Sequence, residues 1–124
     1  MPAKILLVDD TAAVRRALRR YIETETNWNI VGEAEHGKIA VEMVEELRPD
    51  IVLLDLSMPI MNGLEAARHI SAIAPKTQML MFTLHAYPHL LREARKAGIK
   101  DVISKSDEVG TKVLTAIRTL LAAA

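Results

Sequence analysis

Five polar residues that could carry phosphoryl chemistry stand within two residues of the ends of short apolar segments of this 124-residue chain. Asp9 and Asp10 follow the first of these segments, and Asp55 follows the third. A hydroxyl group, Thr83, and an ammonium group, Lys105, follow the fourth and the fifth. If the segments are parallel strands, their carboxyl ends meet at one edge of a sheet, where open α/β sheets bind ligands. We therefore expect these residues to form one site.

Three carboxylates at one sheet edge need a compensating positive charge. At an effective dielectric constant of about 20, two carboxylates about 5 Å apart repel each other by roughly 3 kcal/mol. Lys105 can offset part of this charge, and a hard divalent cation can offset the rest through oxygen ligands. Magnesium usually takes one or two carboxylates and completes its coordination with water and phosphate oxygens. The composition of the cluster therefore favours Mg2+-dependent phosphoryl chemistry.

The position of each residue suggests its role. Asp55 ends the central strand and is the candidate nucleophile, because carboxylates form aspartyl phosphates in covalent catalysis. Asp9 and Asp10 arrive from a neighbouring strand and can hold the metal ion. The metal and Lys105 would neutralise the transferring phosphoryl oxygens, and the hydroxyl of Thr83 could donate to one of them. Taken singly, these residues are more simply a helix cap, a turn residue and a surface charge, so the prediction depends on their joint placement.

The elements that position the site follow from the alternation of apolar runs with segments of helical period. This alternation is typical of βα units that build a parallel sheet. Most of the runs are continuously apolar, which indicates strands that are buried on both faces by two layers of helices. The expected strands are Ile5–Val8, Trp28–Glu33, Ile51–Leu54, Met79–Phe82 and Val102–Ile103.

Five helices are expected between and after these strands. Thr11 and Asp107 are suitable N-cap residues for the first and the last helix, and Gly98 can end the fourth. The sequence therefore predicts a doubly wound α/β domain over residues 1–124. The apolar stripes of the helices begin at Val14, Ile39, Leu64, Leu90 and Val109.

Composition excludes several other classes of protein. Lysine plus arginine and aspartate plus glutamate number 16 each, so no net charge attracts nucleic acid or an anionic membrane. The absence of cysteine excludes disulfides, thiolate metal sites and cysteine nucleophiles, and a cytoplasmic location fits best. We expect no signal peptide and no membrane-spanning stretch in this chain, and no DNA-binding output domain within its 124 residues. Direct contact with nucleic acid or a membrane is therefore not expected.

With these residues in place, the sequence resembles the response-regulator receiver domains of two-component signalling over nearly its whole length. The resemblance is carried by an acidic pair, a phosphoacceptor segment, the turn that follows it, a switch hydroxyl and a basic residue. These are Leu6–Asp10, Leu53–Pro59, Met61–Gly63, Thr83 and Lys105. Leu56–Pro59, Asn62–Ala66 and His85 are most similar to the branch in which a helix-turn-helix output domain follows the receiver.

The resemblance implies a flavodoxin-like fold with five helices and the strand order 2-1-3-4-5. It also implies that Asp10, Asp55 and the backbone carbonyl of Ser57 bind Mg2+, with Asp9 assisting. The phosphoryl group would reach Asp55 from a histidine kinase or a phosphotransfer protein. In this family the receiver promotes its own phosphorylation and dephosphorylation and is not otherwise an enzyme, and some members form homodimers on phosphorylation.

Two alternatives remain open at this point. A small Mg2+-dependent phosphatase with an aspartyl nucleophile usually has a second aspartate two residues after the first, where this chain has Ser57. A receiver-like adaptor that has lost phosphorylation is the other alternative, although all five site residues are present. The chain also has Val102 where many receivers carry an aromatic residue.

Four arginines line the polar side of the first predicted helix. In the receiver family this helix belongs to the part that docks the upstream kinase. The simpler interpretation is a solvent-exposed charged face, and we expect that one. The four residues are Arg15, Arg16, Arg19 and Arg20.

Overall fold

The computed structural model describes residues 2–105 and 109–123, and five parallel strands form one sheet within them. The order of the strands is β2-β1-β3-β4-β5, which confirms the predicted doubly wound topology. The third strand has the predicted bounds, the first differs from its prediction by one residue at one end, and the second and fourth differ by one residue at each end. The strands are β1 (Lys4–Val8), β2 (Asn29–Ala34), β3 (Ile51–Leu54), β4 (Gln78–Thr83) and β5 (Ile99–Ser104).

The fifth strand is longer than the prediction of Val102–Ile103. It lies at the edge of the sheet and pairs only with β4 among the described strands. Lys100 and Asp101 are exposed there. An edge strand can keep polar residues in its ladder because part of it faces water, so a search for continuous apolar runs finds only the buried part.

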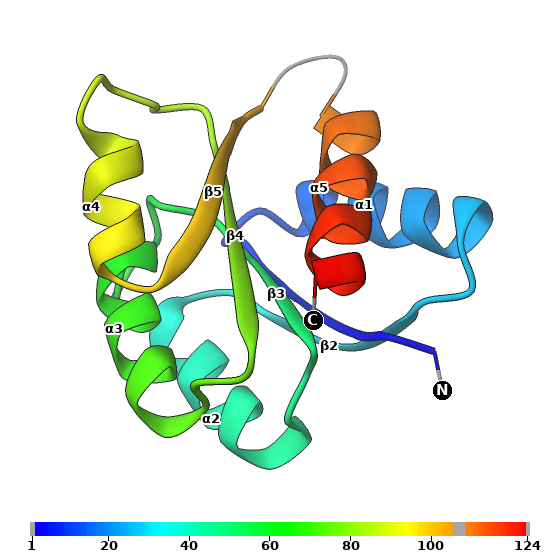
Figure 1. Cartoon of the computed structure of the whole chain (residues 1–124), viewed down its shortest axis with the longest axis horizontal. Helices are drawn as coiled ribbons and strands as arrows, with labels where there is room; N and C mark the ends of the chain where they lie inside the picture. Colours follow the sequence, from blue (N-terminus) through cyan, green and yellow to red (C-terminus); the bar gives the residue numbers. More distant parts are fainter. Residues whose placement is uncertain (1, 106–108, 124) are drawn as a thin grey trace.

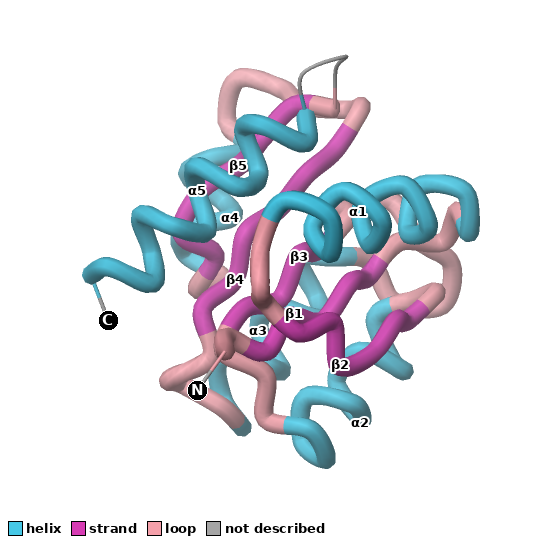
Figure 2. Tube along the Cα trace, turned by 90° about the vertical axis from the view of Figure 1, so that its right-hand side faces the viewer, coloured by secondary structure: helices cyan, strands magenta, loops and turns pink. Residues whose placement is uncertain are grey.

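Helices cover both faces of the sheet (Figures 1 and 2). One face is covered by α1 and α5, and the other by α2, α3 and α4. Alternate residues of β1 point to opposite faces, so that Ile5 and Leu7 pack with α1 and α5 while Leu6 and Val8 pack with the other layer. The helices are α1 (Ala12–Glu25), α2 (Gly37–Leu47), α3 (Gly63–Ile73), α4 (Leu90–Lys96) and α5 (Val109–Ala123).

The ends of the helices follow the predicted signals in part. Gly98, the residue after the C-cap Ala97 of α4, has a φ angle of 99°, a conformation that glycine adopts without strain, and its N–H donates to the carbonyl of Arg95 at 3.0 Å. Thr11 is the N-cap residue of α1, but its side chain makes no capping hydrogen bond. Asp107, the predicted cap of the last helix, lies outside the described residues. None of the helices in the described ranges is long and apolar enough to span a membrane.

Candidate functional site

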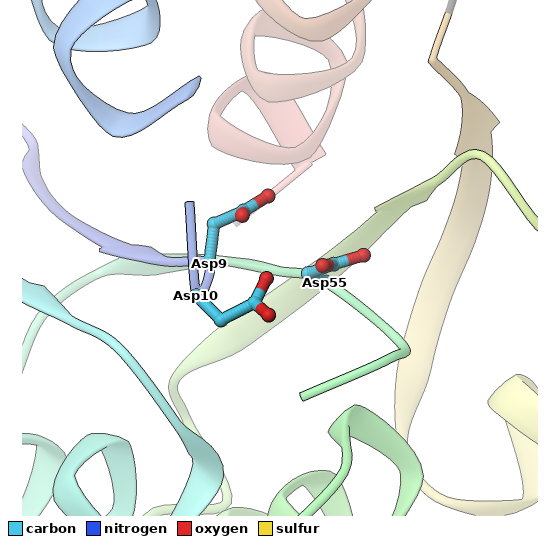
Figure 3. Close-up of side chains that lie close together, drawn as sticks. All are labelled: Asp9, Asp10 and Asp55. Atoms are coloured by element: carbon cyan, nitrogen blue, oxygen red, sulfur yellow. The ribbon is translucent and has the colours of Figure 1, made fainter. Parts of the chain in front are cut away.

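Asp9, Asp10 and Asp55 converge at the carboxyl ends of β1 and β3, as the sequence predicts. One carboxylate oxygen from each residue lies within 4.8 Å of the other two, and Figure 3 shows the three side chains lying close together. The register of the sheet brings them together, because β1 and β3 are adjacent and the N–H of Asp55 donates to the carbonyl of Val8 at 2.9 Å. Asp9 and Asp55 are buried, with 0% and 5% of their surface exposed, whereas Asp10 is exposed.

Lys105 supplies the positive charge of the cluster. Its Nζ lies 2.7 Å from Oδ2 of Asp9 and 3.5 Å from Oδ1 of Asp55. The backbone holds Lys105 at this edge of the sheet, because its N–H donates to the carbonyl of Thr83 at 2.9 Å. The ammonium group also lies 4.8 Å from the centre of the Phe82 ring. Phe82 is a contact that we did not predict, since its sequence signal is only that of a buried strand residue.

The three carboxylates differ in the number and length of the hydrogen bonds that they accept from the protein. Asp9 accepts hydrogen bonds from the Thr11 N–H at 2.8 Å on one oxygen and from Lys105 on the other. Asp55 accepts from the N–H of Leu56 at 2.9 Å. Asp10 accepts only a long hydrogen bond of 3.4 Å, from the Thr11 hydroxyl, among the described residues. Asp10 and Asp55 are therefore the carboxylates with the most free oxygen lone pairs.

Thr83 ends β4 at the same edge of the sheet. The residue is fully buried, and its Oγ1 accepts a hydrogen bond from the N–H of His85 at 3.0 Å. Because a hydroxyl group can accept and donate at once, the hydrogen of this side chain stays available for another acceptor. Its predicted role as a donor to the phosphoryl group is compatible with this arrangement and stays a prediction.

The loop after β3 carries Ser57. Ser57 is exposed and lines an open pocket of about 500 Å³ together with Asp10, Leu56, Met58 and Asn62. The loop closes on itself, because the N–H of Gly63 donates to the carbonyl of Leu56 at 2.8 Å. Asn62 and Glu65 form a capping box that starts α3 at this point. The loop that contains Ser57 is thus held by the hydrogen bond between Gly63 and Leu56 and by the capping box at the start of α3.

The donor set of this site suits a hard divalent cation. All three acidic side chains offer carboxylate oxygen, and Ser57 lines the adjoining pocket. The described residues place no cysteine or histidine in the cluster. An all-oxygen set of few protein ligands is the kind that Mg2+ accepts, because that ion retains several waters.

The environment of Asp55 changes its acidity. Burial, followed by the neighbouring charge of Asp9, raises the pKa of Asp55 from 3.8 to about 6. Lys105 and the N–H of Leu56 lower it, but not enough to offset the burial. At neutral pH the carboxylate is ionised and is more basic than an ordinary aspartate.

We therefore predict that Asp55 titrates near pH 6 in the metal-free protein. Asp9→Asn should lower this pKa, because it removes a neighbouring negative charge, and Lys105→Met should raise it. The measurement is the 13C shift of the Asp55 carboxyl carbon as a function of pH. Asp50→Asn, at the opposite end of β3, is the control and should leave the titration unchanged. A carboxyl that titrates below pH 4 in the wild-type protein would contradict the prediction.

The arginines of α1 do not form the uniform exposed face that we expected. Arg16 and Arg20 are exposed, but Arg15 and Arg19 both bind the carboxylate of Glu33 on β2. Burial raises the pKa of Glu33, but the hydrogen bonds and charges of the two arginines outweigh it and hold that pKa below its ordinary value. The prediction was wrong for Arg15 and Arg19. A helix has the same pattern of polar residues whether its polar side faces solvent or faces a carboxylate on a neighbouring strand.

Comparison with known proteins assigns the chain to a family. Residues 5–118 match the response regulator receiver domain family. The chain belongs to this family. A receiver domain is the phosphorylation-dependent switch of a two-component signalling system, and the predicted fold and class of function are thereby confirmed.

Individual relatives are of different lengths. The chain is 40% identical over 105 residues to the chemotaxis protein CheY of Thermotoga maritima, covering 85% of this chain and 87% of that protein. It is 43% identical over 102 residues to the transcriptional regulatory protein YdfI of Bacillus subtilis, covering 82% of this chain but 47% of YdfI. Among solved structures, the CheX-CheY-BeF3-Mg2+ complex of Borrelia burgdorferi matches with a TM-score of 0.91 and 26% identity, covering 98% of this chain and 90% of the other.

Proposed function

We propose that Asp55 is the phosphoacceptor of this receiver domain and that residues 1–124 form a single switch domain. The observation that carries the proposal is the buried Asp55 carboxylate, which lies in an acidic cluster beside the ammonium group of Lys105. The raised pKa of Asp55 supports the same role, because it makes the carboxylate a better nucleophile than an ordinary aspartate.

In the proposed step, one oxygen of Asp55 attacks the phosphorus atom of the donor. An O–P bond forms as the P–N bond of a phosphohistidine, or the P–O bond of a small phosphodonor, breaks, and the electron pair of that bond leaves with the donor. Asp55 must be ionised to attack. Lys105 would then turn its ammonium group toward the phosphoryl oxygens, and Thr83 would donate its free hydroxyl hydrogen.

We assign the metal site to Asp10, Asp55 and the backbone carbonyl of Ser57, with Asp9 assisting. Bound Mg2+ would neutralise negative charge on the carboxylates and the phosphoryl oxygens. The open lone pairs of Asp10 and Asp55 support this assignment, and Asp9, which already binds Lys105, would act mainly by its charge. The Borrelia relative named above was crystallised with Mg2+ and BeF3, which supports the choice of ion.

The proposed function also implies particular partners for this receiver domain. We expect a histidine kinase or a phosphotransfer protein as the phosphodonor, association into a homodimer on phosphorylation, no direct contact with nucleic acid, and a cytoplasmic location. The chain spans about half the length of YdfI. One arrangement that we propose is therefore a longer protein in which this receiver regulates an output domain. We expect no multiple turnover on external phosphomonoesters, since Ser57 occupies the position of the second aspartate of aspartyl phosphatases.

Phosphoryl uptake tests the proposal directly. Incubation with a small phosphodonor and Mg2+ should add one phosphoryl group, detected by intact mass, in a form stable to acid and labile to base and hydroxylamine. Asp55→Asn should abolish the uptake, and removal of Mg2+ should reduce it by a factor of about 100 or more, because the cluster then carries uncompensated charge. Asp50→Asn is the matched control and should take up the group normally. Undiminished uptake in Asp55→Asn would refute the assignment.

A further inference from the structure

The guanidinium group of Arg15 joins three elements behind the acidic cluster. Arg15 lies on α1, and its Nη1 donates to the backbone carbonyl of Asp9 at 2.6 Å. Its Nε donates to Oε1 of Glu33 on β2 at 3.0 Å. Only 16% of the arginine side chain is exposed. The planar guanidinium thus connects the turn that carries the acidic pair to a neighbouring strand.

The hydrogen bond from Arg15 to the Asp9 carbonyl also restricts the backbone of Asp10. A peptide unit is planar, so fixing the carbonyl oxygen of Asp9 also fixes the N–H and the Cα of Asp10. Asp10 is exposed, and the described residues give its carboxylate one long hydrogen bond, to Thr11. Its side chain therefore has little to hold it in place except the orientation of its own backbone. Arg15 holds the peptide unit between Asp9 and Asp10 from one side, and the N–H of Thr11 bonds the Asp9 side chain in the same turn.

Glu33 keeps Arg15 in place and balances its charge. One carboxylate oxygen of Glu33 binds Arg15, and the other binds Nε of Arg19 at 2.7 Å. A bare guanidinium behind the acidic pair would repel a cation in the site, but the ion pair with Glu33 compensates for that charge. Arg15 can thus order the turn without weakening cation binding.

We propose that Arg15, anchored by Glu33, is a positioning residue that sets the direction of Asp10 toward the divalent ion. This inference rests on the proposed function, since it assigns a role to Arg15 in the same Mg2+ site. Residues that orient metal ligands from behind typically change metal affinity by about tenfold or more when they are removed. The expected defect is in Mg2+ affinity and not in the chemistry at Asp55.

Arg19 provides the matched control. It binds the same Glu33 carboxylate from the same helix, and its other ion pair is with Glu23 at 3.5 Å. Its hydrogen bonds in the described residues do not include Asp9. Arg15→Ala and Arg19→Ala therefore remove comparable ion pairs, but only the first removes the contact with the acidic turn.

The experiment is calorimetric titration of Mg2+ into the wild-type protein, Arg15→Ala and Arg19→Ala. We expect Arg15→Ala to bind Mg2+ about tenfold more weakly and Arg19→Ala to bind as the wild type does. At saturating Mg2+, the rate of phosphoryl uptake by Arg15→Ala should return close to the wild-type rate, which a general loss of structure would not allow. In the metal-free protein, the amides of Asp10 and Thr11 should exchange faster in Arg15→Ala than in Arg19→Ala.

Equal Mg2+ affinities in the two variants would overturn the inference, and so would an uptake rate in Arg15→Ala that stays low at saturating Mg2+. If Arg15→Ala does not fold, Arg15→Lys takes its place, because a single ammonium group cannot bind Asp9 and Glu33 in the bidentate manner of a guanidinium, and the same weakening is expected. A wild-type protein that takes up no phosphoryl group would refute the proposed function instead. A positioning defect leaves the wild type active, so the two failures are distinguishable.

Discussion

In the absence of Mg2+, Asp55→Asn is expected to be more stable than the wild-type protein at neutral pH. Folding places the Asp55 carboxylate in a buried site beside Asp9, and this raises its pKa from 3.8 to about 6. A carboxylate whose pKa rises on folding lowers stability wherever it must be ionised. A rise of about two units corresponds to at most about 3 kcal/mol, and solvent relaxation around the open edge of the site reduces this to about 1–2 kcal/mol.

The pH dependence of this difference has a defined sign. Below pH 3.8 the carboxyl is protonated in both the folded and the unfolded state, so ionisation of Asp55 adds nothing to the difference between the two proteins. Between pH 3.8 and about 6 the folded state binds more protons, and the wild-type stability contributed by this group falls as pH rises. Above about pH 6 the difference in stability between Asp55→Asn and the wild-type protein has its full size and no longer changes with pH.

Urea unfolding of both proteins between pH 4 and pH 8 measures this effect. Addition of Mg2+ should reverse the order, because an ion that binds only the folded state at about 100 times its dissociation constant adds about 2.7 kcal/mol. Asp50→Asn, which changes an exposed carboxylate at the far end of the sheet, controls for the loss of one charge. If the wild-type protein is as stable as Asp55→Asn at pH 8 without Mg2+, then the ionised Asp55 carboxylate does not destabilise the folded state, and the prediction is wrong.

Gly63→Ala is expected to damage both the fold and phosphoryl uptake. A Cβ atom at Gly63 would lie 2.2 Å from the backbone oxygen of Asp55 and 3.0 Å from its carbonyl carbon. Both neighbours are backbone atoms, so no side-chain rotation can relieve the contact. Either the start of α3 or the peptide unit of Asp55 must move. Overpacking of this kind typically costs about 1–3 kcal/mol, and a displacement of about 1 Å at a reacting group can cost about 100-fold in rate.

The control for this variant is Gly32→Ala in β2. There the added Cβ would lie 3.2 Å from the ends of the Leu47 and Leu6 side chains, which can adjust. Thermal unfolding and the initial rate of phosphoryl uptake, measured at a temperature where all three proteins are folded, separate the two effects. We expect a small change in stability and a normal rate for Gly32→Ala. Normal stability together with a normal rate in Gly63→Ala would show that the loop tolerates the displacement.

The sequence determined the positions of the chemical groups at the sheet edge. Asp9, Asp55 and Thr83 are polar residues that end apolar runs, and in a parallel sheet buried on both faces such a run must end where the chain leaves the core. The carboxyl ends of neighbouring parallel strands share one edge, so position along the chain was enough to predict that these residues lie at the same edge of the sheet. Gly98 was predictable for a similar local reason, because the end of a helix often needs a residue with positive φ.

The contacts that join distant parts of the chain were decided only by the tertiary structure. The sequence placed Lys105 in the site, but only the structure shows that its ammonium group binds Asp9, 96 positions away, and that Arg15 binds Glu33, 18 positions away. A local pattern records the period and the burial of one element, but it does not record which other element lies opposite a charged side chain. For that reason the pattern predicted Arg15 to be part of a solvent-exposed stripe. The same limit applies to Gly63, because its closeness to the Asp55 carbonyl arises only when the loop folds back onto the end of β3.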